Sequence, residues 1–176
     1  KTSTANAKSE TIYKLASFKG AANAARRCLV PVTGWFEYRH HAGKTYPYVI
    51  KRIDRDGFNF GGLWERREFN GQEVTTYNVL TTTPNKLAAA VHNNGLRMPV
   101  IIPDALHEAW LDPKTPHEVI RKMLVPYQDG LLEAWPIDRT RLRNPRVNSN
   151  VPEVDAPFSY PELPPRAAHR SHARSS

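Results

Sequence analysis

The chain lacks several features that would place it in a familiar class of enzyme or membrane protein. Its 176 residues include one cysteine, which excludes an internal disulfide and suits a reducing compartment. No apolar run approaches the roughly 20 residues of a membrane-spanning helix, and no apolar signal peptide is visible. The sequence also has no glycine-rich phosphate loop, no Gly-x-Ser-x-Gly and no Cys-x-x-Cys. Nucleotide-dependent and ordinary triad chemistries are therefore unsupported.

The sequence also lacks histidines and cysteines at the spacings that metal sites use. His40 and His41 are adjacent in a predicted turn and His117 stands alone, so we expect no metal ion and no other cofactor. The single cysteine, Cys28, lies in the apolar run 28–32. It is predicted to be a small buried hydrophobe rather than a nucleophile.

Positive charge, in contrast, is plentiful. The chain has 25 Lys and Arg against 17 Asp and Glu, a formal net charge of +8, and its cations are scattered along the sequence. This balance favours a polyanionic partner, nucleic acid first, because each neutralised phosphate releases counterions. The alternative is a soluble protein that happens to be basic, and charge alone does not decide between them.

The length fits one domain with a real core and does not comfortably fit two. We expect this domain over residues 1–160, followed by a disordered basic tail over 161–176 that has too few apolar residues to offset the entropy of ordering. The chain begins Lys1-Thr2-Ser3 rather than with methionine. The loop-like composition of residues 1–5 favours a lead-in from a preceding segment.

Turn signals and apolar spacing predict a mixed fold dominated by strands. Helices are expected within 12–27, from 84–85 to 91, and at 103–111 and 116–124. Strands are expected at 28–38, 46–53, 58–65, 74–83, 97–102 and 131–137, followed by a loop at 144–150. Consecutive short strands with tight turns predict an α+β fold: a mainly antiparallel, curled or barrel-like sheet with peripheral helices.

Glu37 is the most informative residue, because it lies among aromatics in the segment 34–38, Gly-Trp-Phe-Glu-Tyr. A carboxylate in such surroundings is partly desolvated, which raises its pKa towards the range where proton transfer works near neutral pH. The commoner alternative is a strand carboxylate that alternates outward between inward-facing aromatics.

Two further polar segments each allow a structural and a functional interpretation. The segment 6–11, Asn-Ala-Lys-Ser-Glu-Thr, concentrates an amide, a cation and a carboxylate, yet Asn6 or Ser9 could simply cap the following helix. His92 falls at a predicted helix end, where it could cap the helix or act as a general acid or base. Arg97 opens an apolar strand and could bind a phosphate.

Taken in order, these segments resemble the SRAP family, the SOS response-associated peptidases or abasic-site processing proteins. The likeness runs from Asn6 to Pro157, nearly all of the part expected to fold. It rests on ordered motifs at residues 6–11, 27–38, 47–48, 61–65, 80–85, 92, 97–99 and 147–148.

The resemblance implies a sensor of abasic sites in single-stranded DNA. In such proteins a cysteine exposed by removal of the initiator methionine forms a Schiff base with the sugar aldehyde, and its thiol then closes a thiazolidine crosslink. By matching motifs, Glu37 would be the proton shuttle, Asn6 would hold the cysteine and the sugar, and His92 would assist Schiff-base proton transfers and crosslink reversal. Lys8 and Arg97 would bind the DNA backbone.

The implied partner is single-stranded DNA that contains abasic sites, with no membrane partner and no nucleotide cofactor. The implied state is a monomer in the cytoplasm, associated with the nucleoid when it is bound to DNA.

The sequence departs from the family pattern at three points. The N-terminal segment that carries the cysteine is absent, and Cys28 matches an internal strand cysteine without a free α-amine. Lys8 stands where the family usually has arginine, which keeps the charge but loses a bidentate phosphate grip. Asn93-Asn94-Gly95 lengthens the spacing between His92 and Arg97. Three functions follow: a crosslinking enzyme seen in part, which we favour, a single-stranded DNA binder without its nucleophile, or a peptidase.

Overall fold

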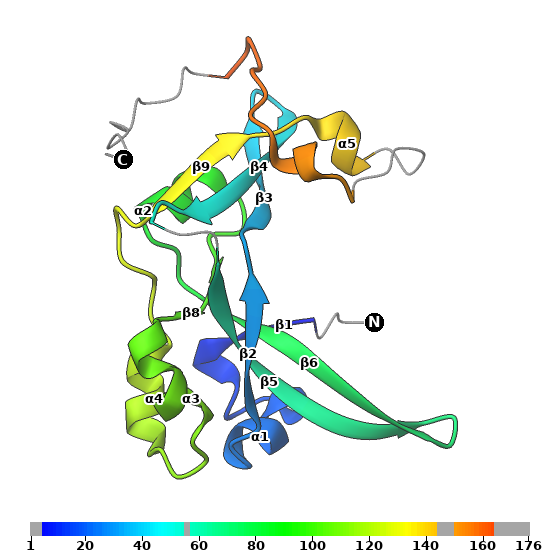
Figure 1. Cartoon of the computed structure of the whole chain (residues 1–176), viewed down its shortest axis with the longest axis vertical. Helices are drawn as coiled ribbons and strands as arrows, with labels where there is room; N and C mark the ends of the chain where they lie inside the picture. Colours follow the sequence, from blue (N-terminus) through cyan, green and yellow to red (C-terminus); the bar gives the residue numbers. More distant parts are fainter. Residues whose placement is uncertain (1–4, 55–56, 144–149, 164–176) are drawn as a thin grey trace.

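The computed structural model describes residues 5–54, 57–143 and 150–163, and its strands form two sheets (Figure 1). The larger sheet has the order β1-β6-β5-β2, with β7 paired to β6 and β8 to β5. The smaller sheet has the order β3-β4-β9. The strands of the larger sheet are β1 Asn6–Lys8, β2 Arg27–Val32, β5 Phe58–Phe69, β6 Gln72–Thr82, β7 Met98–Pro99 and β8 Ile101–Ile102. Those of the smaller sheet are β3 Trp35–His41, β4 Lys44–Arg52 and β9 Leu132–Pro136.

Short helices surround the sheets, which confirms the predicted α+β class. All strand pairs are antiparallel except β1 with β6. The helices are α1 Ala16–Asn23, α2 Lys86–Val91, α3 His107–Leu111, α4 His117–Met123 and α5 Arg139–Arg143, with 3-10 turns η1 Ser9–Thr11, η2 Asp104–Leu106 and η3 Pro152–Asp155. None of the described helices combines the length and apolar composition that a membrane crossing requires.

The prediction of one strand over 28–38 is wrong, because β2 and β3 belong to different sheets. The chain changes sheet at Thr33-Gly34. A Cβ on Gly34 would lie 2.8 Å from the Ile50 carbonyl oxygen and 2.8 Å from Lys51 Cγ. Only glycine lets the backbone pass this close to β4. The crossing places Glu37 on the smaller sheet and Cys28 on the larger one.

The predicted strand over 97–102 is also divided. Val100 separates β7 from β8 and bridges two strands of the larger sheet: its N–H donates to the Leu80 carbonyl at 2.8 Å, and its carbonyl accepts from the Gly61 N–H at 2.9 Å. The helix expected within 12–27 is shorter than that range. The sequence did not predict β1, α5 or η3.

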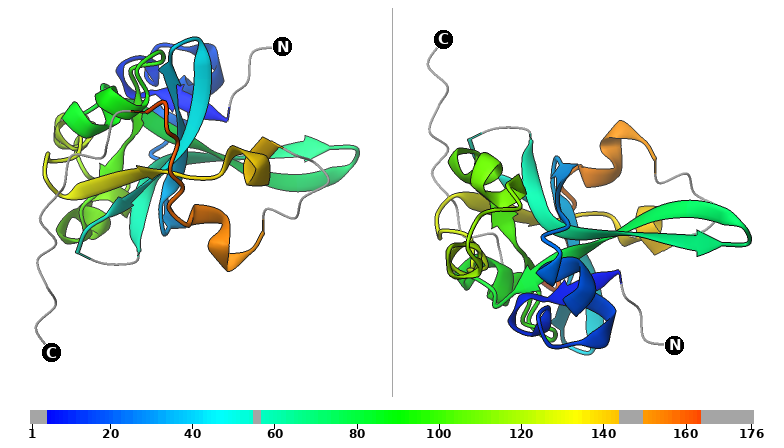
Figure 2. Two further views of the ribbon diagram at one scale, coloured as in Figure 1. Left: turned by 90° about the horizontal axis from the view of Figure 1, so that it is seen from above. Right: turned by 90° about the horizontal axis from the view of Figure 1, so that it is seen from below.

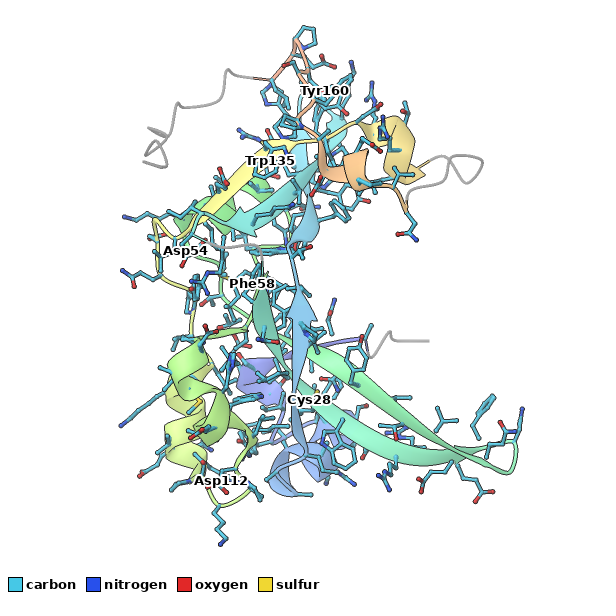
Figure 3. The ribbon with its side chains drawn as sticks, viewed as in Figure 1. Cys28, Asp54, Phe58, Asp112, Trp135 and Tyr160 are labelled. Atoms are coloured by element: carbon cyan, nitrogen blue, oxygen red, sulfur yellow. The ribbon has the colours of Figure 1, made fainter. Side chains whose placement is uncertain are left out.

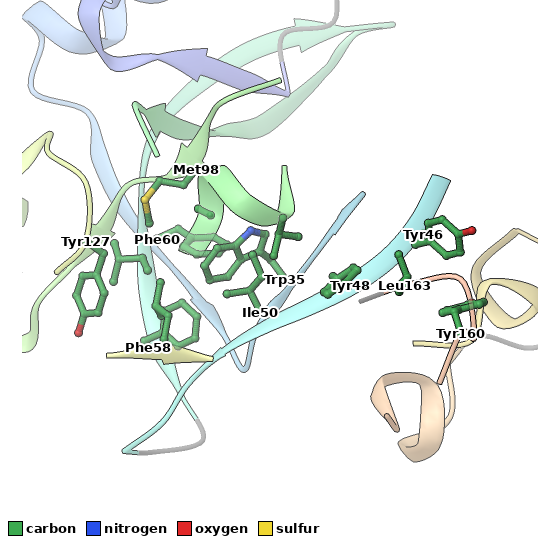
Figure 4. Packing of buried hydrophobic residues seen from close by; sticks show 14 residues of the cluster. Trp35, Tyr46, Tyr48, Ile50, Phe58, Phe60, Met98, Tyr127, Tyr160 and Leu163 are labelled. Atoms are coloured by element: carbon green, nitrogen blue, oxygen red, sulfur yellow. The ribbon is translucent and has the colours of Figure 1, made fainter. Parts of the chain in front are cut away.

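The hydrophobic core has two parts, on opposite faces of the larger sheet. The first lies between the two sheets, where Trp35 makes edge-on ring contacts with Phe58 and Phe60 and lies close to Ile50 and Met98 (Figure 4). The second lies under α1, α3 and α4 and is centred on the fully buried Trp110. The hairpin of β5 and β6 extends beyond both parts, away from the rest of the molecule (Figure 2).

Some sequence predictions fall on residues outside the described ranges. They concern most of the 144–150 loop, the motif at 147–148 and residues 164–176 of the predicted tail. Residues 161–163 are part of the packed structure, and Leu163 is buried in the first core.

Candidate active site

Glu37 faces inward on β3, on the same side of the strand as Trp35. The burial alternates along the strand: Trp35 is buried, whereas Phe36 and Tyr38 are 41% and 36% exposed. The side chain of Glu37 is only 18% exposed. Because successive strand residues point to opposite faces, the aromatic neighbours and not the carboxylate point outward. The alternative of an outward-facing Glu37 is therefore wrong.

The surroundings of Glu37 make its charged form costly. Burial is the largest influence and raises the pKa of Glu37 above its ordinary value. The nearby His92, the Trp35 indole N–H and the Tyr38 backbone N–H oppose this rise and favour the carboxylate. Among the described residues the Trp35 indole N–H has no hydrogen bond of ordinary geometry, so its effect on Glu37 is that of a nearby dipole. Glu37 is thus a carboxyl group whose protonated form is favoured by burial, while His92 favours the ionised form.

His92 ends α2 and turns its ring towards Glu37. Its Nδ1 lies 3.4 Å from Glu37 Oε2 and 3.1 Å from the Arg97 carbonyl oxygen. A carbonyl oxygen only accepts hydrogen bonds, so this contact assigns a proton to Nδ1. The neutral ring then keeps a lone pair on Nε2 and can take up a second proton. His92 thus lies at the helix end as predicted, and its ring also contacts a carboxyl group.

Arg97 is engaged by a carboxylate in this structure. Its Nη1 and Nη2 donate to Glu10 Oε1 and Oε2 at 2.7 and 2.9 Å, and Nη2 also donates to the Thr81 carbonyl. These hydrogen bonds hold the pKa of Glu10 below its ordinary value. The guanidinium thereby ties η1 to β6. A DNA phosphate would meet Arg97 only by sharing or displacing Glu10.

Asn6 and Lys8 lie on β1, which runs parallel to β6 with Asn6 beside Val79 and Lys8 beside Thr81. Both are exposed, while Ala7 between them is buried. Alternation places their side chains on the face of the sheet that carries Val79 and Thr81. Neither Asn6 nor Ser9 caps a helix, because the residues at those positions are Lys8 for η1 and Leu15 for α1. The helix-cap interpretation is wrong.

A series of contacts joins these residues where the smaller sheet meets the larger one. Glu37 contacts His92, the His92 ring contacts the Arg97 backbone, and the Arg97 side chain bonds to Thr81 beside β1. The structure thus brings Glu37, His92 and Arg97 together and places Lys8 next to Thr81. Asn6 lies two residues farther along the same face.

Sequence reasoning missed three contributors to this region: Glu10, Thr81 and Asn93. Glu10 and Thr81 lie within motifs that carried the family resemblance, so their place in those motifs was an available signal. Asn93 had none, because its hydrogen bonds go to the backbone of His40, far away in sequence.

Cys28 lies on β2 in the body of the larger sheet (Figure 3). It is partly buried, and burial raises the pKa of its thiol, which disfavours the nucleophilic thiolate. In the part of the chain that the structure describes, no group of three or more His, Cys, Asp or Glu side chains could hold a metal ion. Near Glu37 the structure instead places a desolvated carboxyl group beside an imidazole.

Comparison with known proteins decides the family. The model of the family described as SOS response associated peptidase (SRAP) matches residues 1–144. The chain belongs to the SRAP family. Among the curated SRAP relatives, the abasic site processing protein YoqW of Bacillus subtilis is 32% identical over 147 residues, which are 82% of this chain and 63% of YoqW. The abasic site processing protein YobE of the same organism is 31% identical over 135 residues, 75% of this chain and 60% of YobE.

A solved structure gives the same result for the fold. A crystallised protein from Bacteroides thetaiotaomicron superposes with a TM-score of 0.81 at 30% sequence identity, over 88% of this chain and 66% of that one. This SRAP chain spans about 60 to 63% of the curated relatives named above.

Proposed function

We propose that the protein recognises abasic sites in single-stranded DNA and processes them covalently, with Glu37 as the group that moves protons. The observation that carries this proposal is the Glu37–His92 pair, a desolvated carboxyl with a raised pKa 3.4 Å from an imidazole. Its support from relatives is that YoqW and YobE are both named abasic site processing proteins.

The reaction needs a proton donor and acceptor at several steps, which suits such a pair. An abasic sugar is mostly a closed ring, so a proton must leave its C1′ hydroxyl and one must reach the ring oxygen to free the aldehyde. An α-amine then bonds to C1′, and the resulting hydroxyl leaves as water after it is protonated, which yields the Schiff base. The thiol of the same cysteine then gives up its proton and its sulfur bonds to that carbon, while the C=N double bond becomes a single bond and the nitrogen takes a proton, which closes the thiazolidine. We assign these proton transfers to Glu37, assisted by His92.

The nucleophile of this scheme is an N-terminal cysteine, which residues 1–176 do not contain. Cys28 does not fit the role, because it lies within β2 and burial raises the pKa of its thiol. We assign to Asn6 the positioning of the cysteine and the sugar, since its exposed side chain shares a face with Thr81.

DNA binding is assigned to the cations near this site. Lys8 is exposed beside Thr81, and the net charge of +8 favours a polyanion. Arg97 takes part by exchanging Glu10 for a phosphate, or else holds η1 in place as it does here.

Adduct formation tests the proposal. The open reading frame that contains residues 1–176 is expressed from its own start codon, and the product is incubated with a single-stranded oligonucleotide carrying one abasic site. We expect an adduct that survives denaturation, none with the same oligonucleotide lacking the abasic site, and none from residues 1–176 alone. Absence of the adduct from a product that opens with cysteine would refute the covalent step.

A non-catalytic single-stranded DNA binder is the second candidate, favoured by the basic charge together with the placement of Cys28. It predicts salt-dependent binding by residues 1–176 and no preference for abasic DNA. A peptidase, suggested by the family's description, has less support. The described contacts of the His92 ring go to a carbonyl and a carboxylate, whereas a nucleophile would supply a hydroxyl or thiol.

A further inference from the structure

The loop between α2 and β7 is fastened to β3 by one side chain. Asn93 Oδ1 accepts a hydrogen bond from the His40 backbone N–H at 2.9 Å, and Asn93 Nδ2 donates to the His40 carbonyl at 2.8 Å. The amide thus satisfies both backbone groups of one residue on the strand that carries Glu37. This pairing fixes the start of the loop, and with it His92, relative to β3.

The same loop keeps a space that the His92 ring fills. A Cβ on Gly95 would lie 2.1 Å from His92 Nε2 and 2.4 Å from His92 Cε1. Any larger residue at this position would therefore push the imidazole out of its place. The ring is held on its other side by the hydrogen bond from Nδ1 to the Arg97 carbonyl.

The backbone of the loop is closed around this arrangement. The Leu96 N–H donates to the His92 carbonyl at 3.0 Å, and Leu96 adopts a left-handed conformation with a φ of 46°. A non-glycine residue in this region is strained and persists only where its surroundings over-determine it. The loop therefore has a single defined conformation that supports the His92 ring.

We propose that Asn93 and Gly95 are positioning residues that hold the His92 imidazole against Glu37. Asn93 sets the distance from the loop to β3, and Gly95 provides the space in which the ring presents Nδ1 to Glu37 and to the Arg97 carbonyl. Although the sequence between His92 and Arg97 is lengthened, the His92 ring therefore still contacts the Arg97 carbonyl oxygen. The catalytic consequence rests on the proposed function, whereas the geometric one does not.

The geometry is tested on residues 1–176 by ¹⁵N NMR of the His92 ring. In the wild type the neutral ring is expected to carry its proton on Nδ1. In Gly95→Ala the displaced ring loses the Arg97 carbonyl, and the proton is expected on Nε2. The matched control is Gly57→Ala, whose Cβ would meet only the Val32 carbonyl at 3.9 Å and should leave the wild-type signal. Retention of the Nδ1 proton in Gly95→Ala would overturn the role of Gly95.

Asn93→Ala gives a second, independent measurement. We expect it to weaken the His92 Nδ1–H signal and the protection of the His40 amide from exchange, with Asn94→Ala, a change of the exposed neighbour, as the control. Asn93→Asp keeps the acceptor for the His40 N–H and loses the donor, so its effect should be intermediate. If the His40 amide of Asn93→Ala exchanges as slowly as that of the wild type, the hydrogen bonds of Asn93 do not hold the loop to β3.

Activity completes the test. In the product of the open reading frame that forms the adduct, Gly95→Ala should lower the rate constant of adduct formation at saturating abasic DNA by about 100-fold. This is the cost of misplacing a reacting group by about 1 Å. The DNA dissociation constant should stay within about twofold of the wild type, since no DNA contact is removed. A change confined to the dissociation constant contradicts the positioning role. Absence of any wild-type adduct refutes the proposed function instead, while the NMR result stands by itself.

Discussion

Two pairs of a glutamate with a basic side chain flank the loop that follows α2, and their geometries differ. Glu37 and His92 meet through one 3.4 Å contact, and burial raises the pKa of Glu37. Glu10 and Arg97 meet through two hydrogen bonds of 2.7 and 2.9 Å, which lower the pKa of Glu10. The side chain of Glu10 is 47% exposed, compared with 18% for Glu37.

The difference separates a group that can exchange protons from one that holds structure. A bidentate carboxylate–guanidinium pair keeps its charge over the working pH range, because arginine does not release its proton. A desolvated carboxyl beside an imidazole brings together two groups that can each accept and release a proton. The same kind of residue, glutamate, thus has opposite properties on the two sides of one loop.

The largest expected effect is that of Glu37→Gln. Loss of the proton acceptor should lower the rate of adduct formation by about 100-fold to 10,000-fold, measured by denaturing electrophoresis. Glu10→Gln is the matched control and should keep most of the rate. An equal or larger loss in Glu10→Gln would reverse the assignment of the two pairs.

Glu37→Gln should also make the folded protein more stable. Because the folded state raises the pKa of Glu37, it binds a proton more readily than the unfolded state, and stability falls as the pH rises through the interval between the two pKa values. Glu37→Gln removes this loss, so its unfolding midpoint should exceed that of the wild type above the raised pKa. The difference should vanish at a pH below the unfolded value of about 4.3.

The second effect is that of His92→Gln. Gln keeps a polar side chain but cannot take a proton, so adduct formation should slow by up to about 100-fold. His92 is the main influence that favours the ionised form of Glu37, and its removal should raise the pKa of Glu37 further. Carboxyl ¹³C NMR titration measures this change. A lowered pKa of Glu37 in His92→Gln would show that the two groups are not coupled as described.

Much of this site follows from the sequence because its signals are local. The aromatic segment around Glu37 predicts its desolvation, although only Trp35 of these aromatics lies on the same face of β3 and Phe36 and Tyr38 point outward. The alternation of Asn6, Ala7 and Lys8 along β1 follows once that strand is known. Glycine and proline positions locate most of the turns. These features depend on residues within a few positions of one another.

The rest depends on long-range contacts that no local pattern contains. Only Thr33-Gly34 separates the apolar run Cys28–Val32 from the aromatic segment that follows it. Gly34 is required there because the Ile50 carbonyl oxygen lies against it, a contact that no local pattern shows. The partner of Arg97 is Glu10, 87 positions away in the chain. For that reason the sequence indicated a phosphate ligand for Arg97, and the structure shows a carboxylate on it.

The third effect is on stability and concerns the Arg97 side of the comparison. Arg97→Lys keeps the charge but loses the fork that binds Glu10 and the Thr81 carbonyl, so unfolding in urea should show a loss of about 1 to 3 kcal/mol. The matched control is Arg66→Lys, at an exposed pair with Glu73 on the hairpin, where less than about 0.5 kcal/mol is expected. Equal losses at the two sites would mean that Arg97 is no more than a surface ion pair.

The smallest effect is that of Glu10→Gln on stability. The folded state lowers the pKa of Glu10, so its charge stabilises the protein above the unfolded pKa of about 4.3, and the contribution is lost as the pH falls through the lowered folded value. Solvent screens this exposed carboxylate, and Gln can still accept one hydrogen bond from Arg97, so the loss at pH 7 should be about 0.5 kcal/mol. Urea unfolding of both proteins at pH 7 and pH 3 measures it, and 1 M salt should shrink the difference at pH 7. If the difference in unfolding free energy between the two proteins grows towards pH 3, the folded state raises the pKa of Glu10, as it does that of Glu37.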